Sequence, residues 1–246
     1  MASLSDKRAL VTGGSRGIGA AIVRRLARDG AHVAFTYGQS AGPAEDLVRE
    51  VGAAGGRAFA IAADSADPAA VERSVREAAA GLGGLDILVN NAGVARGGPL
   101  EAMSLADIDL LIDVNIRGVV LAIRAAIPHL GRGGRIVTTG SCLAERVAMP
   151  GIAAYSMTKS ALISLTGGLA RDLGGRGITV NLVHPGPTDT DMNPAAGPQS
   201  EAQRAMIPLG RYGRAEDIAA AVAFLVGPEA GQINGTGLTV DGGLNA

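Results

Sequence analysis

Tyr155 and Lys159 stand four residues apart in a helical pattern, and their chemistry is the easiest to define in this sequence. Helical residues at that spacing share one face, so the phenol and the ammonium group lie near each other. A free tyrosine has a pKa of about 10, and lowering it to about 7 requires roughly 4 kcal/mol in favour of the phenolate. A neighbouring positive charge supplies part of this free energy. The pair predicts a tyrosine that exchanges a proton, although such a pair taken alone is usually structural.

Ser141 and Asn115 add polar groups that fit the same chemistry. Ser141 follows the expected strand 135–139, at the carboxyl edge where sheets of this kind bind ligands. Its hydroxyl can hydrogen-bond a carbonyl oxygen while Tyr155 donates the proton. Asn115 lies within a long helical pattern, either at an exposed position or holding a water that relays protons to Lys159. The four residues predict a site that binds a carbonyl oxygen and donates a proton to it.

A glycine-rich turn separates the first expected strand from the first expected helix. It reads TGGSRGIG over residues 12–19. Glycines let the backbone approach a phosphate closely, and the helix N-terminus offers free N–H groups to the anion. The glycine spacing, at Gly13, Gly17 and Gly19, departs from GxGxxG, so the turn alone is weak evidence. Its place in a strand–turn–helix unit predicts a dinucleotide site.

The end of the second expected strand distinguishes NADP(H) from NAD(H). An acidic residue there would bind the ribose hydroxyls of NAD(H), but residues 36–40 read TYGQS and contain no carboxylate. Arg16 is placed to pair with a 2′-phosphate, and Ser40 to donate a hydrogen bond to it. The alternative is that Arg16 only solvates a surface turn. The segment favours NADP(H) over NAD(H).

Apolar runs and helical patterns alternate along the whole chain and must position these residues. We expect a Rossmann-type, doubly wound parallel sheet of about seven strands, with helices on both faces, in one domain covering residues 1–246. The expected strands are 8–11, 32–37, 58–62, 87–89, 135–139, 179–184 and 238–240. The expected helices are 18–27, 44–51, 68–80, 107–130, 155–173 (ending at Gly174 as its C-cap) and 215–226. Residues 185–207 contain four prolines and are expected to form a substrate loop or lid.

The composition excludes several other classes of protein. The formal net charge is −1 and aromatic residues make up 2%, which argues against nucleic-acid binding. No stretch is long and apolar enough for a membrane span, and the N-terminus lacks the apolar core of a signal peptide. Cys142 is the only cysteine, which fits a cytoplasmic protein, and we read it as a small packed thiol. The three histidines lack metal-ligand spacing, so no metal site is expected.

Taken in order, these motifs resemble the short-chain dehydrogenase/reductase family. They include the turn, the NNAG segment at 90–93, the four polar residues above and Pro185-Gly186, and they span nearly the whole chain. The resemblance implies a Ser–Tyr–Lys site assisted by Asn, adenine contacts from Asp64 and Ser65, nicotinamide contacts from Thr188 and Thr190, and a homotetramer. The full set of expected NADP(H) contacts is Gly13, Ser15, Arg16, Gly17, Ile18, Gly19, Tyr37, Gly38, Ser40, Asp64, Ser65, Asn91, Ala92, Gly93, Tyr155, Lys159, Pro185, Gly186, Thr188 and Thr190.

The substrate stays open between three interpretations. A general carbonyl reductase would bind a small ketone or aldehyde against mostly apolar residues, for which the candidates are Leu143, Met149, Ile152 and Met192. A 3-oxoacyl-[acyl-carrier-protein] reductase would need a basic docking patch, which the net charge does not strongly support. The third interpretation is a regulatory protein. Residues 141–194 resemble biofilm-dispersal members of the family, which are described as binding cyclic di-GMP. The retained catalytic set argues against a purely regulatory role.

Overall fold

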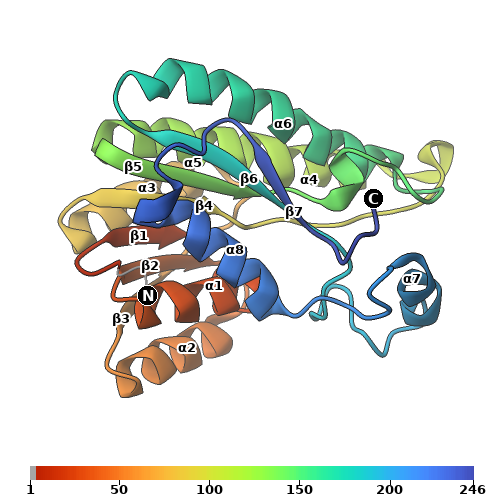
Figure 1. The fold of residues 1–246 in the computed structure, drawn as a ribbon, viewed down its shortest axis with the longest axis horizontal. Helices are drawn as coiled ribbons and strands as arrows, with labels where there is room; N and C mark the ends of the chain where they lie inside the picture. The colour runs from red at the N-terminus through yellow and green to blue at the C-terminus, as the bar shows by residue number, and fades with distance from the viewer. Residues whose placement is uncertain (1–3) are drawn as a thin grey trace.

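Seven short apolar strands form one parallel sheet in the computed structural model, which describes residues 4–246 (Figure 1). The strands are β1 (Arg8–Val11), β2 (His32–Tyr37), β3 (Arg57–Ala62), β4 (Leu85–Asn90), β5 (Leu130–Thr139), β6 (Thr179–Pro185) and β7 (Gly237–Val240). Their order across the sheet is β3-β2-β1-β4-β5-β6-β7, and every neighbouring pair is parallel. The predicted fold class and all seven predicted strands are confirmed.

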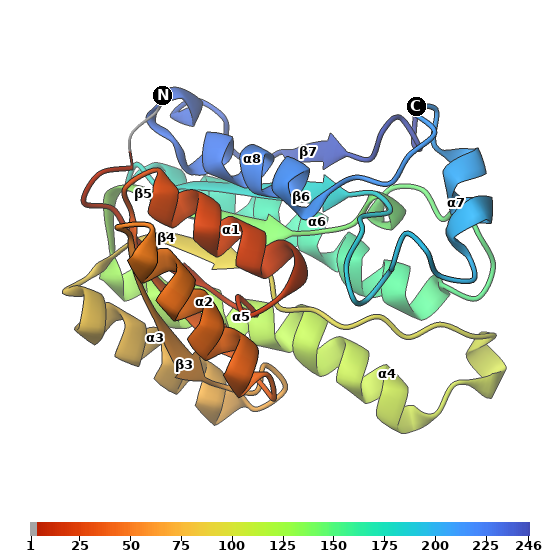
Figure 2. The ribbon, with the colours of Figure 1, turned by 90° about the horizontal axis from the view of Figure 1, so that it is seen from below.

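Helices cover both faces of the sheet, as the apolar strands require (Figure 2). They are α1 (Gly17–Arg28), α2 (Ala41–Ala53), α3 (Pro68–Leu82), α4 (Leu105–Ile112), α5 (Val119–Ala126), α6 (Ala153–Gly174), α7 (Ser200–Met206) and α8 (Ala215–Val226). One core lies where α1, α2 and α8 pack on the sheet, and a second lies beneath α3, α5 and α6. No helix within residues 4–246 is long and apolar enough to cross a membrane.

Local sequence signals explain where α3 begins and ends. The Asp67 side chain accepts a hydrogen bond from the backbone N–H of Ala69, which caps the helix, and Pro68 occupies the first turn. At the other end, Gly83 adopts a left-handed conformation, with φ of 74°. The helix is thus fixed at both ends by residue types suited to those positions.

The uninterrupted helix expected over residues 107–130 is wrong. The structure has α4, then a π-helical turn η2 (Asp113–Gly118), then α5 and a short 3-10 turn that contains Pro128. Pro128 lacks a backbone N–H and cannot continue the helix. Apolar residues occupy most positions of 105–126 and mark no single helical face, so periodicity did not reveal the π turn.

Two smaller expectations also need correction. Gly174 lies inside α6 and the capping residue is Gly175, whose φ of −61° is right-handed. The left-handed glycine of this turn is Gly177, which precedes β6. The segment 185–207 is not entirely irregular, because it contains α7.

The strand order changes direction between β1 and β4: β2 and β3 extend the sheet on one side of β1, and β4 to β7 extend it on the other. Strands β1 and β4 pair with each other although they are distant in sequence. The carboxyl ends of these parallel strands lie at one edge of the sheet. Loops diverge on either side of such a point and leave a crevice for a ligand. The expected functional residues follow β1, β2, β4, β5 and β6 at this edge.

Candidate active site

Ser141 lies directly beyond β5 and is buried, with 6% of its surface exposed. Its hydroxyl oxygen accepts a hydrogen bond from the backbone N–H of Leu143 at 3.1 Å. This bond begins a short 3-10 turn, η4 (Cys142–Ala144). This bond does not use the hydroxyl hydrogen, which can be donated to the phenol of Tyr155 or to a substrate oxygen that displaces it.

Tyr155 and Lys159 lie on the first turns of α6, as the sequence predicts. The Lys159 Nζ atom lies 5.9 Å from the centre of the Tyr155 ring and donates a hydrogen bond to the carbonyl of Thr139 at 3.0 Å. The structure therefore brings the carboxyl end of β5 and one face of α6 together. Ser141 lies close enough to Tyr155 to act on its pKa, so the three side chains form one cluster.

Burial controls the protonation of this cluster. It lowers the pKa of Lys159 to about 8, and it raises the pKa of Tyr155 because the hydrogen bond from Ser141 offsets only part of the desolvation. The sequence argument expected a lowered phenol pKa, so this expectation is wrong for the protein alone. A neutral phenol is nevertheless the form that donates a proton.

Asn115 is fully buried in the π turn, which excludes an exposed helix position. Its Nδ2 donates to the carbonyl of Val94 at 2.9 Å and to the hydroxyl of Thr158 at 3.1 Å, and its Oδ1 accepts from the N–H of Val94 at 2.9 Å. The Oδ1 atom and Lys159 Nζ would each lie 3.4 Å from a Cβ placed on Gly93. The side chain thus ties the segment after β4 to α6, close to the lysine.

The glycine turn forms a tight cradle at the end of β1. A Cβ on Gly13 would lie 2.8 Å from the Cα of Ala92, and one on Gly19 only 2.1 Å from the carbonyl oxygen of Gly13. The Asn91 side chain donates to the carbonyls of Thr12 and Gly13, so the NNAG segment holds the turn in place. Helix α1 begins without a side-chain cap. Its first N–H groups therefore suit a phosphate group.

The far end of this crevice carries the residues expected at the adenosine. Tyr37 is half-buried at the end of β2, and Gly38 is exposed. Ser40 precedes α2 without capping it, which leaves its hydroxyl unused by the helix. Arg16 is exposed, and its nearest acidic partner is Asp191, at 3.8 Å.

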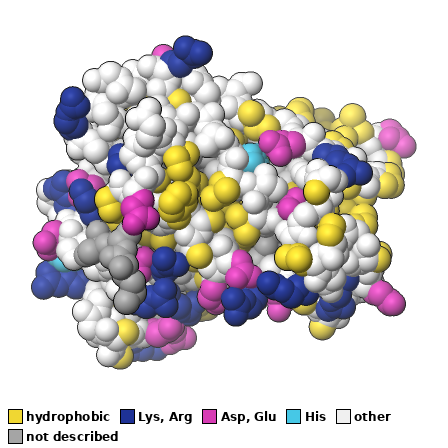
Figure 3. Space-filling model, in the orientation of Figure 1, with side chains coloured by type: hydrophobic (Ala, Val, Ile, Leu, Met, Phe, Trp, Pro, Cys, Tyr) yellow, Lys and Arg dark blue, Asp and Glu magenta, His cyan; other side chains and the backbone are white. Residues whose placement is uncertain are grey.

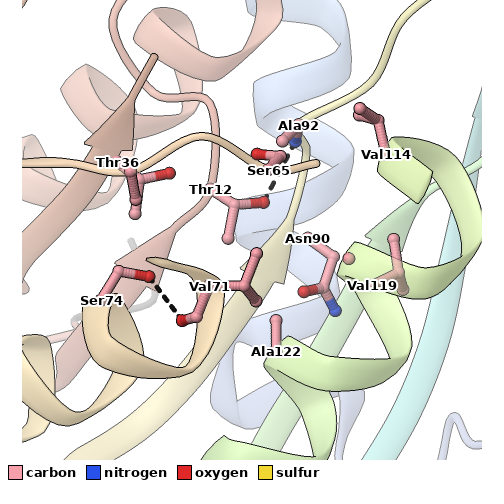
Figure 4. A pocket seen from close by; sticks show the side chains of 12 residues that line it. Thr12, Thr36, Ser65, Val71, Ser74, Asn90, Ala92, Val114, Val119 and Ala122 are labelled. Atoms are coloured by element: carbon pink, nitrogen blue, oxygen red, sulfur yellow. Dashed lines mark hydrogen bonds between the residues drawn. The ribbon is translucent and has the colours of Figure 1, made fainter. Parts of the chain in front are cut away.

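A small cavity of about 10 Å³, lined by both polar and apolar side chains, lies beneath the turn, between β1, β4 and the helices behind them (Figure 4). Thr12, Ser74 and Asn90 are among the residues that line it, and Asn90 Oδ1 is buried without a hydrogen-bond partner among residues 4–246. The space suits a single water molecule. Ser65 also borders this cavity, whereas Asp64 is exposed and accepts a hydrogen bond from Ala66.

The segment after β6 folds back onto the glycine turn. Gly186 donates to the carbonyl of Val240, and the Thr188 hydroxyl donates to the carbonyl of Gly186. The Thr190 methyl group would lie 3.4 Å from a Cβ on Gly17, so this segment touches the turn directly. The structure thus brings together Thr190 and Gly17, as a shared cofactor crevice requires.

The expected substrate residues differ in exposure. Met192 is 61% exposed, while Leu143, Met149 and Ile152 are half-buried. Leu143 follows Ser141 directly, and Ile152 lies next to Gly97 of the segment after β4. No group of three histidine, cysteine or acidic residues within residues 4–246 is arranged to hold a metal ion.

Comparison with known proteins identifies the family. A family model described as enoyl-(acyl carrier protein) reductase matches residues 13–245. A short-chain dehydrogenase from Burkholderia cenocepacia J2315, solved in complex with NADP, is 61% identical, with a TM-score of 0.97 over 99% of each chain. The chain belongs to the short-chain dehydrogenase/reductase family.

Two curated members of this family are similar over essentially the full length. The cyclic-di-GMP-binding biofilm dispersal mediator protein of Escherichia coli (strain K12) is 45% identical over 100% of both chains. The 3-oxoacyl-[acyl-carrier-protein] reductase FabG of Staphylococcus aureus (strain N315) is 42% identical, over 97% of this chain and 98% of the relative. The relatives share the oxidoreductase fold but not one described role.

Several residues that build this short-chain dehydrogenase/reductase site were missed in the sequence. The Thr12 hydroxyl accepts hydrogen bonds from the N–H groups of both Asn91 and Ala92. The Thr158 hydroxyl links Asn115 to the carbonyl of Tyr155. Thr12 adjoins the glycine turn and Thr158 precedes Lys159, so position near a motif was the available signal. The buried His184 was noted and set aside, because it lacks metal-ligand spacing.

Proposed function

We propose that this protein is an NADP(H)-preferring carbonyl reductase with Ser141, Tyr155 and Lys159 as its catalytic residues. The observation that carries the proposal is the cluster of these three side chains at the carboxyl end of β5, joined to the glycine cradle by the NNAG segment. The NADP complex of the 61% identical relative supports the choice of cofactor.

The residues around the crevice fit an NADP(H) molecule. The glycine turn and the uncapped start of α1 would hold the pyrophosphate, and Arg16 with Ser40 would bind the 2′-phosphate. Asp64 and Ser65 would contact the adenine, while Thr188 and Thr190 would bind the carboxamide. Bound there, NADPH supplies the hydride for the carbonyl carbon of the substrate.

The protein's own groups manage the oxygen and the proton. Ser141 donates a hydrogen bond to the carbonyl oxygen and orients it. Tyr155, kept neutral by burial, donates its proton to the oxygen as negative charge develops there. Lys159, charged below a pKa of about 8, stabilises the phenolate that is left. A water near Asn115 and Lys159 would return the proton, with Asn115 positioning the surrounding backbone.

Turnover of a small substrate panel tests the proposal. NADPH absorbance would be followed with a β-keto ester, an aryl ketone and an acetoacetyl thioester, with NADH in parallel. We expect reduction of the free ketones, and a higher kcat/KM for NADPH than for NADH. Preference for NADH would contradict the assignment of Arg16, and no turnover of any carbonyl compound would contradict the reductase.

A 3-oxoacyl-[acyl-carrier-protein] reductase is the second candidate, favoured by the family model and by the 42% identical FabG relative. The same catalytic residues would serve it, so only the substrate distinguishes the two. Reduction of the thioester alone, with no reduction of free ketones, would support this candidate.

A regulatory role that binds cyclic di-GMP is the third candidate, favoured by the 45% identical dispersal mediator. Equilibrium binding of cyclic di-GMP to the full chain tests it. Absence of binding at tens of micromolar ligand would remove it.

The proposal also includes a homotetramer in the cytoplasm. Exposed apolar side chains provide surface for contacts between copies, and they gather over α8 and β7 on the face in Figure 3, where Phe224 is 43% and Leu238 36% exposed. Val120 of α5 and Ile163 of α6 are exposed to a similar extent. A monomer mass by light scattering would contradict the tetramer.

A further inference from the structure

His184, near the carboxyl end of β6, lies in a slot that only glycine neighbours permit. The residue is 1% exposed. A Cβ on Gly140 would lie 2.5 Å from its Nδ1, and a Cβ on Gly237 would lie 2.4 Å from its Nε2. Neither glycine has a positive φ, so space for the imidazole explains both of them. The ring therefore packs between the end of β5 and the start of β7.

The polar contacts of the ring are directed at Ser141. The Nδ1 atom lies 3.0 Å from the backbone oxygen of Ser141 and 3.3 Å from its backbone nitrogen. As the protonated nitrogen it donates to the carbonyl, and as the unprotonated nitrogen it accepts from the N–H. Either tautomer links the buried ring to the backbone of the residue whose hydroxyl faces the substrate.

The ring is uncharged at neutral pH in this setting. Burial lowers its pKa, and the positive charge of Lys159 acts in the same direction, whereas the Glu145 carboxylate and the hydrogen bond to Ser141 oppose the shift in part. A neutral ring offers one donor and one acceptor nitrogen in the slot.

The geometry of Ser141 explains why such support matters. Its backbone is extended, with φ of −164°, and it joins the end of β5 to the turn η4. Backbone pairing with β6 ends at Gly140, whose N–H donates to the carbonyl of Val183 at 2.7 Å, so the contact with His184 is the next link along the segment. A displacement of about 1 Å at a group that orients a substrate costs roughly 100-fold in rate.

We propose that His184 is a positioning residue, which fixes the backbone of Ser141 and thereby directs its hydroxyl at the substrate oxygen. This inference rests on the proposed carbonyl reduction. Gly140 and Gly237 contribute to this positioning, because the absence of a side chain at each leaves the space that the ring occupies. His184 itself does not contact the reacting atoms.

Three substitutions separate the Nδ1 contact from the volume of the ring. His184→Asn places an amide atom where Nδ1 lies, His184→Gln places its amide one bond farther along, and His184→Leu fills the slot without a polar atom. His129→Asn, at an exposed histidine, is the matched control. The measurements on the full-length enzyme are kcat with the best ketone of the panel, the Kd for NADPH, and the melting temperature.

We expect His184→Leu and His184→Gln to lose about 10- to 100-fold in kcat while the Kd for NADPH stays unchanged. His184→Asn should restore most of the turnover, and the control should match wild type. If His184→Leu does not fold, the Asn and Gln variants decide the question. Equal turnover in all folded variants would overturn the role of His184. A wild-type enzyme that reduces no carbonyl compound would instead overturn the proposed function.

Discussion

The two sides of the cofactor crevice differ in whether backbone groups or side chains form their surface. The glycine turn after β1 is formed by backbone groups packed so closely that a single added carbon would collide with its neighbours. The segment after β6 instead presents exposed side chains, including Met192 at 61% and Leu209 at 66% exposure. The first region leaves no space for side chains, so its glycines stand out as a motif in the sequence. The second presents side chains to solvent, and under the proposed function these would contact the substrate.

The catalytic cluster lies between these regions and should show the largest effect. Tyr155→Phe removes the proton donor and keeps the ring, so we expect turnover to fall by about 10²- to 10⁴-fold. The Kd for NADPH should remain near that of wild type, because the phosphate cradle is untouched. Stopped-flow turnover and NADPH titration together measure both quantities. Near-normal activity of this variant would sink the catalytic assignment.

The glycine turn after β1 should not accommodate any side chain at Gly19. A Cβ there would lie 2.1 Å from the carbonyl of Gly13 and 2.5 Å from Asn91 Nδ2. We expect Gly19→Ala to weaken NADPH binding at least about tenfold and to cost about 1–3 kcal/mol of stability.

Gly42→Ala is the control for that change, because a Cβ there meets open space within α2. It should leave NADPH binding unchanged and stabilise the fold by about 0.5–1 kcal/mol. Chemical denaturation with NADPH titration tests the two variants. Equal behaviour of the variants would contradict the account of the cradle.

The pH dependence reports on Lys159. Its pKa of about 8 means that the ammonium charge is lost as pH rises through 8, so reduction should slow above that pH. Between about 8 and 10.5 the unfolded chain binds a proton that the folded chain does not, so this residue makes the fold more stable as pH rises. Below pH 8 the buried charge costs stability in full.

Lys159→Met tests both consequences. The variant should lose turnover, while its melting temperature at pH 7 should exceed that of wild type, because the buried ammonium is removed. Differential scanning fluorimetry across pH measures this. A lower melting temperature at pH 7 would show that the hydrogen bond to Thr139 outweighs the cost of burying the charge.

The smallest effect on NADPH binding is expected from the ion pair between Arg16 of the glycine turn and Asp191 of the segment after β6. Asp191 lies 3.8 Å from Arg16, and under the proposed function it would compete with the 2′-phosphate for the guanidinium group. Both side chains are exposed, so the pair is worth at most about 1 kcal/mol, and Asp191→Asn should tighten NADPH binding about two- to fivefold. The gain should disappear at high salt, and binding of NADH should not change. Equal gains for both cofactors would contradict competition at Arg16.

Sequence patterns predicted the sheet and the cluster because both depend on short-range signals. The apolar runs marked all seven strands, and the motifs marked Ser141, Tyr155 and Lys159 at the correct edge. The π turn around Asn115 was missed, because apolar residues occupy most positions on both sides of it and mark no single helical face. The contact between His184 and Ser141 joins residues 43 positions apart, and no local pattern reports such a pair.

The sequence also did not predict the direction in which the pKa of Tyr155 shifts. The spacing of Tyr155 and Lys159 gave their proximity, but the extent of burial depends on everything packed around them. In the structure, desolvation acts on both groups and is the largest influence on each.

Transfer of deuterium from NADPH that carries deuterium at both C4 positions of the nicotinamide tests the central claim most directly. The wild-type enzyme would be mixed with the labelled cofactor and the best ketone of the panel, and the alcohol analysed by mass spectrometry. The account predicts one deuterium on the former carbonyl carbon, formed by wild type and almost absent with Tyr155→Phe. An alcohol without deuterium, or equal labelled product from both enzymes, would contradict it.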